Sequence, residues 1–141
     1  MSDPLYIWLA GTVRGKGRAR FVANKNGPGG RAYTPTATVN YEAALRLAAQ
    51  DAMDGKPLFE GAIRLHMVAW FAVPKSFSKA KRSDALGNRL QPTVKPDFDN
   101  IAKLVDAFNG VIWFDDKQIT DATFAKRYSD EPGLAIEVRA A

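Results

Sequence analysis

Alternating hydrophobic and polar residues indicate two strands in the second half of the chain. The segment Ala62–Phe71 alternates, and one face carries Ile63, Leu65, Met67, Ala69 and Phe71. This spacing predicts a strand with one well-buried face. Leu134, Ile136 and Val138 repeat the pattern and predict a final strand.

Three further segments are rich in residues that favour strands. They are Leu5–Gly11, the short run Val111–Phe114, and Ile119–Tyr128. Aromatic and β-branched residues suit a pleated, half-buried surface. The sequence therefore predicts about five strands.

Hydrophobic residues at helical spacing predict two principal helices. The first runs to about Met53 and carries Tyr41, Ala44, Leu45 and Ala48 on one face. The second runs from about Asp99 to Phe108, and Asn109-Gly110 ends it. Strands and helices in this mixed order predict a single α+β domain over residues 1–141, with a mixed or mostly antiparallel sheet.

Two segments between these elements are polar and basic. Thr12–Thr36 is rich in glycine and predicts a long loop or irregular hairpin with its tip at Gly27–Gly30. Pro74–Val94 predicts a loop or a short helix. A loop as long as the first one is often functional in so small a domain.

Composition excludes several classes of protein. The 141 residues include no cysteine and one histidine, His66, which is predicted to lie on the surface. A disulfide framework, a thiol nucleophile and a metal site built from Cys or His are therefore excluded. No hydrophobic run is long enough to span a membrane and the first residues lack the features of a signal peptide, so we expect a cytoplasmic protein.

The net charge of +5 is unevenly distributed along the sequence. Residues 1–40 hold six basic residues and one acid, and residues 75–95 hold the same numbers, whereas six acids fall between Asp97 and Asp121. Phosphate backbone is the expected partner of the two basic segments. The alternative is a pair of solvated loops.

The glycine-rich segment after the first strand does not bind a nucleotide cofactor. Gly11–Arg18 lacks the spacing of a P-loop, and Arg20 stands where a dinucleotide fingerprint has its third glycine. Basic side chains in this segment and in the second basic segment are instead typical of contacts to a sugar–phosphate backbone. The candidate DNA-binding residues are Arg14, Lys16, Arg18, Arg20, Lys25, Lys75, Lys79, Lys81, Arg82 and Lys95.

A group of acids around the second helix suggests metal-dependent chemistry. Asp97 and Asp99 stand at the helix start, Lys103 follows one turn later, and Asp115-Asp116 come after the next short strand. If the two acidic pairs converge, their carboxylates form an oxygen-ligand site that prefers Mg²⁺ or Mn²⁺ to zinc.

Each of these residues also has a purely structural interpretation. Asp97 or Asp99 suits a helix N-cap, Asp115-Asp116 suits a turn, and Lys103 suits a surface partner of Asp99 at i,i+4. Like charges that lie close together are unfavourable unless a cation joins them. This argues against all three structural interpretations being correct at the same time. Asp106 and Asp121 are interpreted as solvated positions.

The segment Lys95–Ile119 closely resembles the signature of RusA-type crossover junction endodeoxyribonucleases, small Holliday junction resolvases of bacteria, prophages and phages. The sequence there is Lys-Pro-Asp-Phe-Asp-Asn-Ile-Ala-Lys-Leu-Val-Asp-Ala-Phe-Asn-Gly-Val-Ile-Trp-Phe-Asp-Asp-Lys-Gln-Ile. Lys16–Phe21 and Ala32–Pro35 are similar to the opening of the family. The resemblance therefore covers most of the chain.

The resemblance implies a homodimer that binds a four-way DNA junction and makes paired symmetric nicks with Mg²⁺. It places the essential acids at Asp97, Asp99 and Asp116, a supporting metal ligand at Asp115, and the catalytic lysine at Lys103. Two alternatives stay open from the sequence. One is a branched-DNA-binding module without catalysis, and the other is a less selective Mg²⁺ nuclease acting on flaps or RNA.

Overall fold

A mixed four-stranded sheet forms the centre of the computed structural model, which describes residues 3–16, 20–25, 27–33 and 36–141. The strand order is β1 (Leu5–Ala10), β6 (Gly133–Ala140), β4 (Ile63–Ala72) and β5 (Ile119–Ser129). β6 is antiparallel to both of its neighbours, whereas β4 and β5 are parallel. The predicted α+β fold is confirmed.

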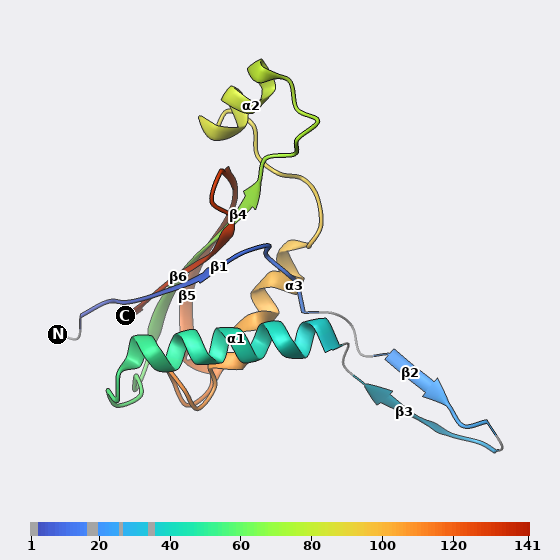
Figure 1. Ribbon diagram of the computed structural model, residues 1–141. Helices are drawn as coiled ribbons and strands as arrows, with labels where there is room; N and C mark the ends of the chain where they lie inside the picture. Colours follow the sequence, from blue (N-terminus) through green and yellow to red (C-terminus); the bar gives the residue numbers. More distant parts are fainter. Residues whose placement is uncertain (1–2, 17–19, 26, 34–35) are drawn as a thin grey trace.

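One face of the sheet is covered by α1 (Thr36–Met53) and by a second helical segment (Figure 1). That segment consists of α3 (Phe98–Ala102) and the 3₁₀ helix η1 (Lys103–Phe108). The predicted helical stripe is buried here, since Ile101, Leu104 and Phe108 are fully inaccessible to solvent. The second helix therefore forms as predicted, but its second half is wound as a 3₁₀ helix.

The alternation predicted for the central strand is also present. Ile63, Leu65, Met67 and Ala69 are buried on the covered face of β4, and Leu45 of α1 lies in the same hydrophobic core. Burying such a side chain stabilises a fold by about 1.5–3 kcal/mol, so this face fixes the register of the strand.

The N-terminal glycine-rich segment forms a separate hairpin. β2 (Arg20–Ala23) pairs antiparallel with β3 (Gly30–Tyr33), and the backbone N–H of Asn24 donates to the Gly29 carbonyl at 2.9 Å. Figure 1 shows this hairpin extending away from the sheet. The predicted irregular hairpin with its tip near Gly27–Gly30 is confirmed.

The second basic segment contains a short helix, α2 (Lys79–Leu86). The Ser78 hydroxyl caps it by accepting a hydrogen bond from the Lys81 backbone N–H at 3.1 Å. A small hydrophobic cluster that includes Val73, Ala85 and Tyr128 attaches it to the end of the sheet. None of the helices in the described part of the chain is long and apolar enough to cross a membrane.

The prediction of a strand at Val111–Phe114 is wrong, because these residues form a turn. Only isolated bridges join Trp113 to Phe59 and Asn109. The segment turns at Gly110, where φ is +79°, and the Trp113 carbonyl accepts the Gly110 N–H at 2.7 Å. The Trp113 indole is fully buried and donates to Asn109 at 2.7 Å, so it anchors a tight turn in the core. The main sheet therefore has four strands, and the other two lie in the hairpin.

Candidate active site

The start of α3 presents two carboxylates and one ammonium to solvent. Asp97 occupies the N-cap position, but in the described structure its side chain makes no capping hydrogen bond. Asp99 pairs with Lys103 at 3.7 Å, and both side chains are more than half exposed. The interpretation of Asp97 as an N-cap is therefore right for its position and wrong for its side chain, which stays available for other contacts.

A lysine of the sheet holds the segment that leads to these acids. Lys126, in β5, donates from its ammonium group to the carbonyls of Val94 and Pro96, the second at 3.2 Å. The same ammonium lies 4.9 Å from the centre of the Phe71 ring. Two bonds to the backbone on either side of Lys95 fix the approach of the chain to Asp97.

An exposed aromatic residue separates the two acids. Phe98 is 58% exposed, and its ring packs edge-to-face on Phe124 of β5 with centroids 4.9 Å apart. Both rings border an apolar cavity of about 300 Å³ between α3 and β5. The Phe98–Phe124 contact fixes the first turn of α3 against the sheet.

The second acidic pair begins η2 (Asp116–Gln118). The Asp115 carboxylate accepts the Lys117 N–H at 2.9 Å, and the Gln118 side chain accepts the Asp115 N–H at 3.0 Å, which completes a capping box. The bond from Lys117, followed by one with Asp116, lowers the pKa of Asp115. A structural role for Asp115 in a turn is confirmed.

Asp116 lies among other carboxyl groups. A hydrogen bond with the Asp115 carboxyl raises the pKa of Asp116, and burial and the neighbouring Asp106 carboxyl raise it further. Carboxylates this close repel one another, and a bound cation would relieve the repulsion. Asp116 is therefore the carboxyl group of this pair whose charge is least favoured by its surroundings.

Asp106 is not merely solvated, contrary to its sequence interpretation. Its carboxylate accepts a hydrogen bond from the Lys16 ammonium at 3.2 Å. The same ammonium lies 3.5 Å from the Glu42 carboxylate of α1. Burial lowers the pKa of Lys16, but hydrogen bonds and attraction from these two acids outweigh it, so the pKa is raised overall. Asp121 instead pairs with Arg64 at 3.1 Å.

The predicted convergence of the two acidic pairs is not found. Over residues 3–16, 20–25, 27–33 and 36–141, no three Asp, Glu, His or Cys side chains gather closely enough to hold a metal ion. The structure brings Asp116 to Asp115 and Asp106, and Asp99 to Lys103. The donors are nevertheless all carboxylate oxygens. This set fits Mg²⁺, which proteins often hold with one or two carboxylates and substrate phosphates.

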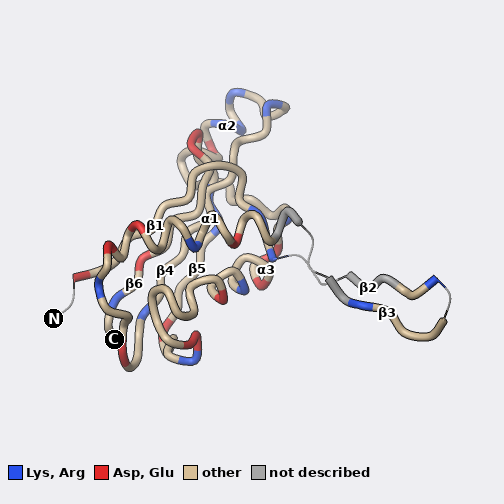
Figure 2. The backbone as a smooth tube through the Cα atoms, turned by 60° about the horizontal axis from the view of Figure 1, so that its bottom comes forward, with Lys and Arg blue, Asp and Glu red and all other residues tan. Residues whose placement is uncertain are grey.

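In Figure 2, α3 lies between the β2–β3 hairpin and α2, and both of these segments carry Lys and Arg positions. The start of α3, with Asp97 and Asp99, is called the acidic face below. On one side the arm before and within the β2–β3 hairpin carries Arg14 and Lys25, which are exposed. On the other side, the exposed candidates in and around α2 are Lys75, Lys79, Lys81, Arg82 and Lys95. Arg18 and the side chain of Arg20 lie outside the described residues.

The sequence model of the family described as "Endodeoxyribonuclease RusA" matches residues 10–139, which is nearly the whole chain. The chain belongs to the RusA family. RusA proteins are endodeoxyribonucleases that resolve Holliday junctions in DNA recombination, and they depend on divalent metal ions. The matched residues include the segment Lys95–Ile119, on which the sequence resemblance mainly depends. They also include the β2–β3 hairpin and the acidic face.

The chain is also similar to the "Uncharacterized protein YqaN" of Bacillus subtilis (strain 168). The two are 38% identical over 85 residues, which are 58% of this chain and 60% of that protein. The similar region thus spans about three fifths of the relative.

The sequence contained no indication that Glu42 and Lys126 contribute to this region, and it indicated only a solvated position for Asp106. Lys16 and Asp106 are 90 residues apart, so no local pattern reveals their contact. One signal was present: Asp99, Lys103 and Asp106 recur at spacings of four and three, which place them on one helical face.

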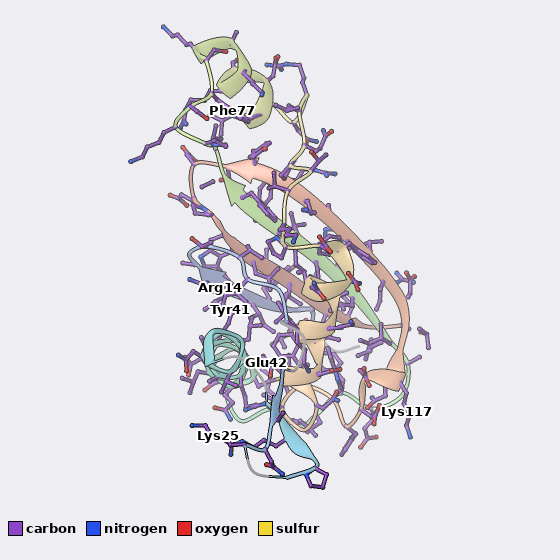
Figure 3. All side chains as sticks on the ribbon, turned by 90° about the vertical axis from the view of Figure 1, so that its right-hand side faces the viewer. Arg14, Lys25, Tyr41, Glu42, Phe77 and Lys117 are labelled. Atoms are coloured by element: carbon purple, nitrogen blue, oxygen red, sulfur yellow. The ribbon has the colours of Figure 1, made fainter. Side chains whose placement is uncertain are left out.

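A buried tyrosine beside the arm gives a prediction about alkaline pH. Figure 3 shows Tyr41 close to Arg14 and to Glu42 on α1. Burial raises the pKa of Tyr41 from 10.0 to about 12. The unfolded chain thus loses this proton first, and stability should fall as the pH rises from 10 towards 12. Thermal unfolding of wild type and Tyr41→Phe between pH 9 and 11 tests this. The wild type should lose more stability, and parallel curves would contradict the prediction.

Proposed function

We propose that this chain is a Mg²⁺-dependent endodeoxyribonuclease that resolves four-way DNA junctions by paired symmetric nicks, in DNA recombination and repair. The observation that carries the proposal is the exposed set Asp97, Asp99 and Lys103 at the start of α3. The Asp97 carboxylate makes no capping bond in the described structure, and the Asp99–Lys103 pair is an exposed one that adds little stability. A DNA-binding module without catalysis has no use for carboxylates facing phosphates.

The proposed roles follow from the chemistry of phosphodiester hydrolysis. When bound, a divalent ion lowers the pKa of a water molecule and neutralises phosphate oxygens. The proposed metal ligands are Asp97, Asp99 and Asp116. Since no three such side chains gather in the described residues, one or two of these carboxylates would hold the ion together with phosphate oxygens of the DNA. Asp115 would support Asp116 through the capping box that fixes their turn. Lys103 would donate to the phosphate oxygen on which negative charge develops.

The two basic regions are proposed to bind the arms of the junction. In Figure 2 they lie on either side of α3, so a backbone held by both would pass over this helix, whose first turn presents Asp97 and Asp99. A homodimer with two-fold symmetry would present two such centres, which matches paired cuts in a substrate of similar symmetry.

The substrate can be tested with the purified chain and matched four-way, flap and linear duplexes of the same sequence, together with an RNA version. We expect Mg²⁺-dependent, symmetric nicks in the four-way junction and much slower cutting of the others. Equal cutting of flaps or RNA would favour a less selective nuclease, and binding without any cutting would favour the non-catalytic module.

Exposed cations of α2 give a prediction about salt dependence. Lys79→Ala with Arg82→Ala should weaken junction binding and reduce the slope of log affinity against log salt by up to about 1.8, because each phosphate contact contributes about 0.9. Fluorescence anisotropy at several salt concentrations, without divalent metal, measures both effects. Lys56→Ala, an exposed lysine outside both basic regions, is the control. An unchanged slope would show that Lys79 and Arg82 of α2 do not contact the DNA phosphates.

A further inference from the structure

The N-terminal arm, defined here by the described residues 11–16, 20–25 and 27–33, contacts the acidic face through Gly15 and Lys16. The backbone N–H of Lys16 donates to the carbonyl of Asn100 in α3 at 2.7 Å. Asn100 directly follows Asp99 in the sequence. The arm is therefore hydrogen-bonded to the same helical turn that presents the proposed catalytic acids.

Gly15 permits this close approach. A Cβ atom added at Gly15 would lie 2.9 Å from the Cβ of both Asn100 and Pro96. Real Cβ contacts are essentially never so short, so any larger residue must push the arm away from α3. Glycine is thus required here by the contact between the arm and the segment that carries Asp97.

The Lys16 side chain strengthens the same contact. Its ammonium joins Asp106 of η1 at 3.2 Å and Glu42 of α1 at 3.5 Å, and its side chain is 31% exposed. The Glu42 Oε1 atom is buried and makes no hydrogen bond in the described part of the chain, so the ammonium is what compensates its charge. A lysine engaged by two carboxylates is a poor candidate for a phosphate contact.

We propose that Gly15 and Lys16 form an anchor that positions the DNA-binding arm relative to the catalytic acids. This inference rests on the proposed function, and it changes the role predicted for Lys16 from a DNA contact to a positioning residue. The hairpin beyond the anchor binds the backbone, and the anchor sets where that backbone lies over α3. Loss of the anchor misplaces the scissile phosphate but leaves the charges that bind DNA in place.

Two variants break the anchor in different ways, and a third variant outside both basic regions is the control. Gly15→Ala removes the close approach and keeps every charge, whereas Lys16→Ala removes the ion pairs. Lys56→Ala removes an exposed lysine that lies in neither basic region. Lys16→Arg keeps the cation and tests for rescue.

Single-turnover cleavage of a four-way junction at saturating protein separates positioning from binding. We expect both anchor variants to cut about tenfold to a hundredfold more slowly, since small misplacements of a substrate have effects of this size. Their junction affinity and salt slope without metal should match wild type. Lys56→Ala should match wild type in every measurement, and Lys16→Arg should recover most of the rate lost by Lys16→Ala.

A phosphate contact at Lys16 would give a different result. Lys16→Ala would then lower affinity and reduce the salt slope by about 0.9, while Gly15→Ala would cut at the wild-type rate. That pattern would overturn the proposal.

Amide hydrogen exchange tests the anchor without any cleavage. The Lys16 amide should exchange slowly in wild type and Lys56→Ala, and faster in Gly15→Ala and Lys16→Ala. Exchange of the wild-type Lys16 amide at the rate of an unstructured peptide would overturn the anchor whatever the cleavage results. If wild type cuts no DNA, the proposed function fails, and exchange alone decides whether the anchor exists.

Discussion

Asp97→Asn should lower Mg²⁺-dependent cutting of a four-way junction by about a thousandfold, because a lost metal ligand removes several kcal/mol of transition-state stabilisation. The asparagine keeps the size of the side chain and removes its charge. Asp97 makes no capping hydrogen bond in the described structure, so the free energy of unfolding should change by less than about 0.5 kcal/mol. Junction binding without metal should be retained.

This combination of results separates the catalytic role of Asp97 from the capping role. An N-cap whose side chain accepted a backbone bond would contribute about 0.5–2 kcal/mol over alanine, and such a cap tolerates asparagine well. Asp51→Asn, at an exposed position of α1, controls for the loss of one negative charge. Full Mg²⁺-dependent cutting by Asp97→Asn would contradict the proposed catalytic role of Asp97.

Local pattern was enough to predict most of the fold. The period of two in β4 and the helical stripe through Ile101 and Phe108 both appear in the structure, because each is set by which side of one element faces the core. The failure at Val111–Phe114 has a physical reason. Ile112 and Trp113 are fully buried, whereas Phe114 is 61% exposed, and the turn at Gly110 satisfies backbone groups that a strand would pair with a neighbour.

The acidic site was predicted residue by residue but not in its arrangement. Asp97, Asp99 and Lys103 lie within one short helical segment, and their spacing alone brings them together. Asp115 with Gln118 three residues later is also a local signature, and it marks a capping box. The contacts of Lys16 with Glu42 and Asp106 instead depend on how α1 and η1 pack, which no sequence spacing reveals.

Lys103→Ala should lower the rate of junction cleavage by about a hundredfold to a thousandfold and leave the fold almost as stable as wild type. The effect on rate follows from removing one donor aimed at developing negative charge. The small effect on stability follows from the exposure of the Asp99–Lys103 pair, since exposed i,i+4 pairs contribute about 0.3–0.5 kcal/mol. Single-turnover cleavage and chemical denaturation measure the two quantities.

Arg64→Ala is a matched control, because Arg64 also forms an exposed ion pair, with Asp121 at 3.1 Å. It should resemble Lys103→Ala in stability but cut at the wild-type rate. Lys103→Arg keeps a cation of different shape and should recover only part of the activity, since a guanidinium does not place its donors where an ammonium does. If Lys103→Ala and Arg64→Ala cut equally well, Lys103 is a surface partner of Asp99 and nothing more.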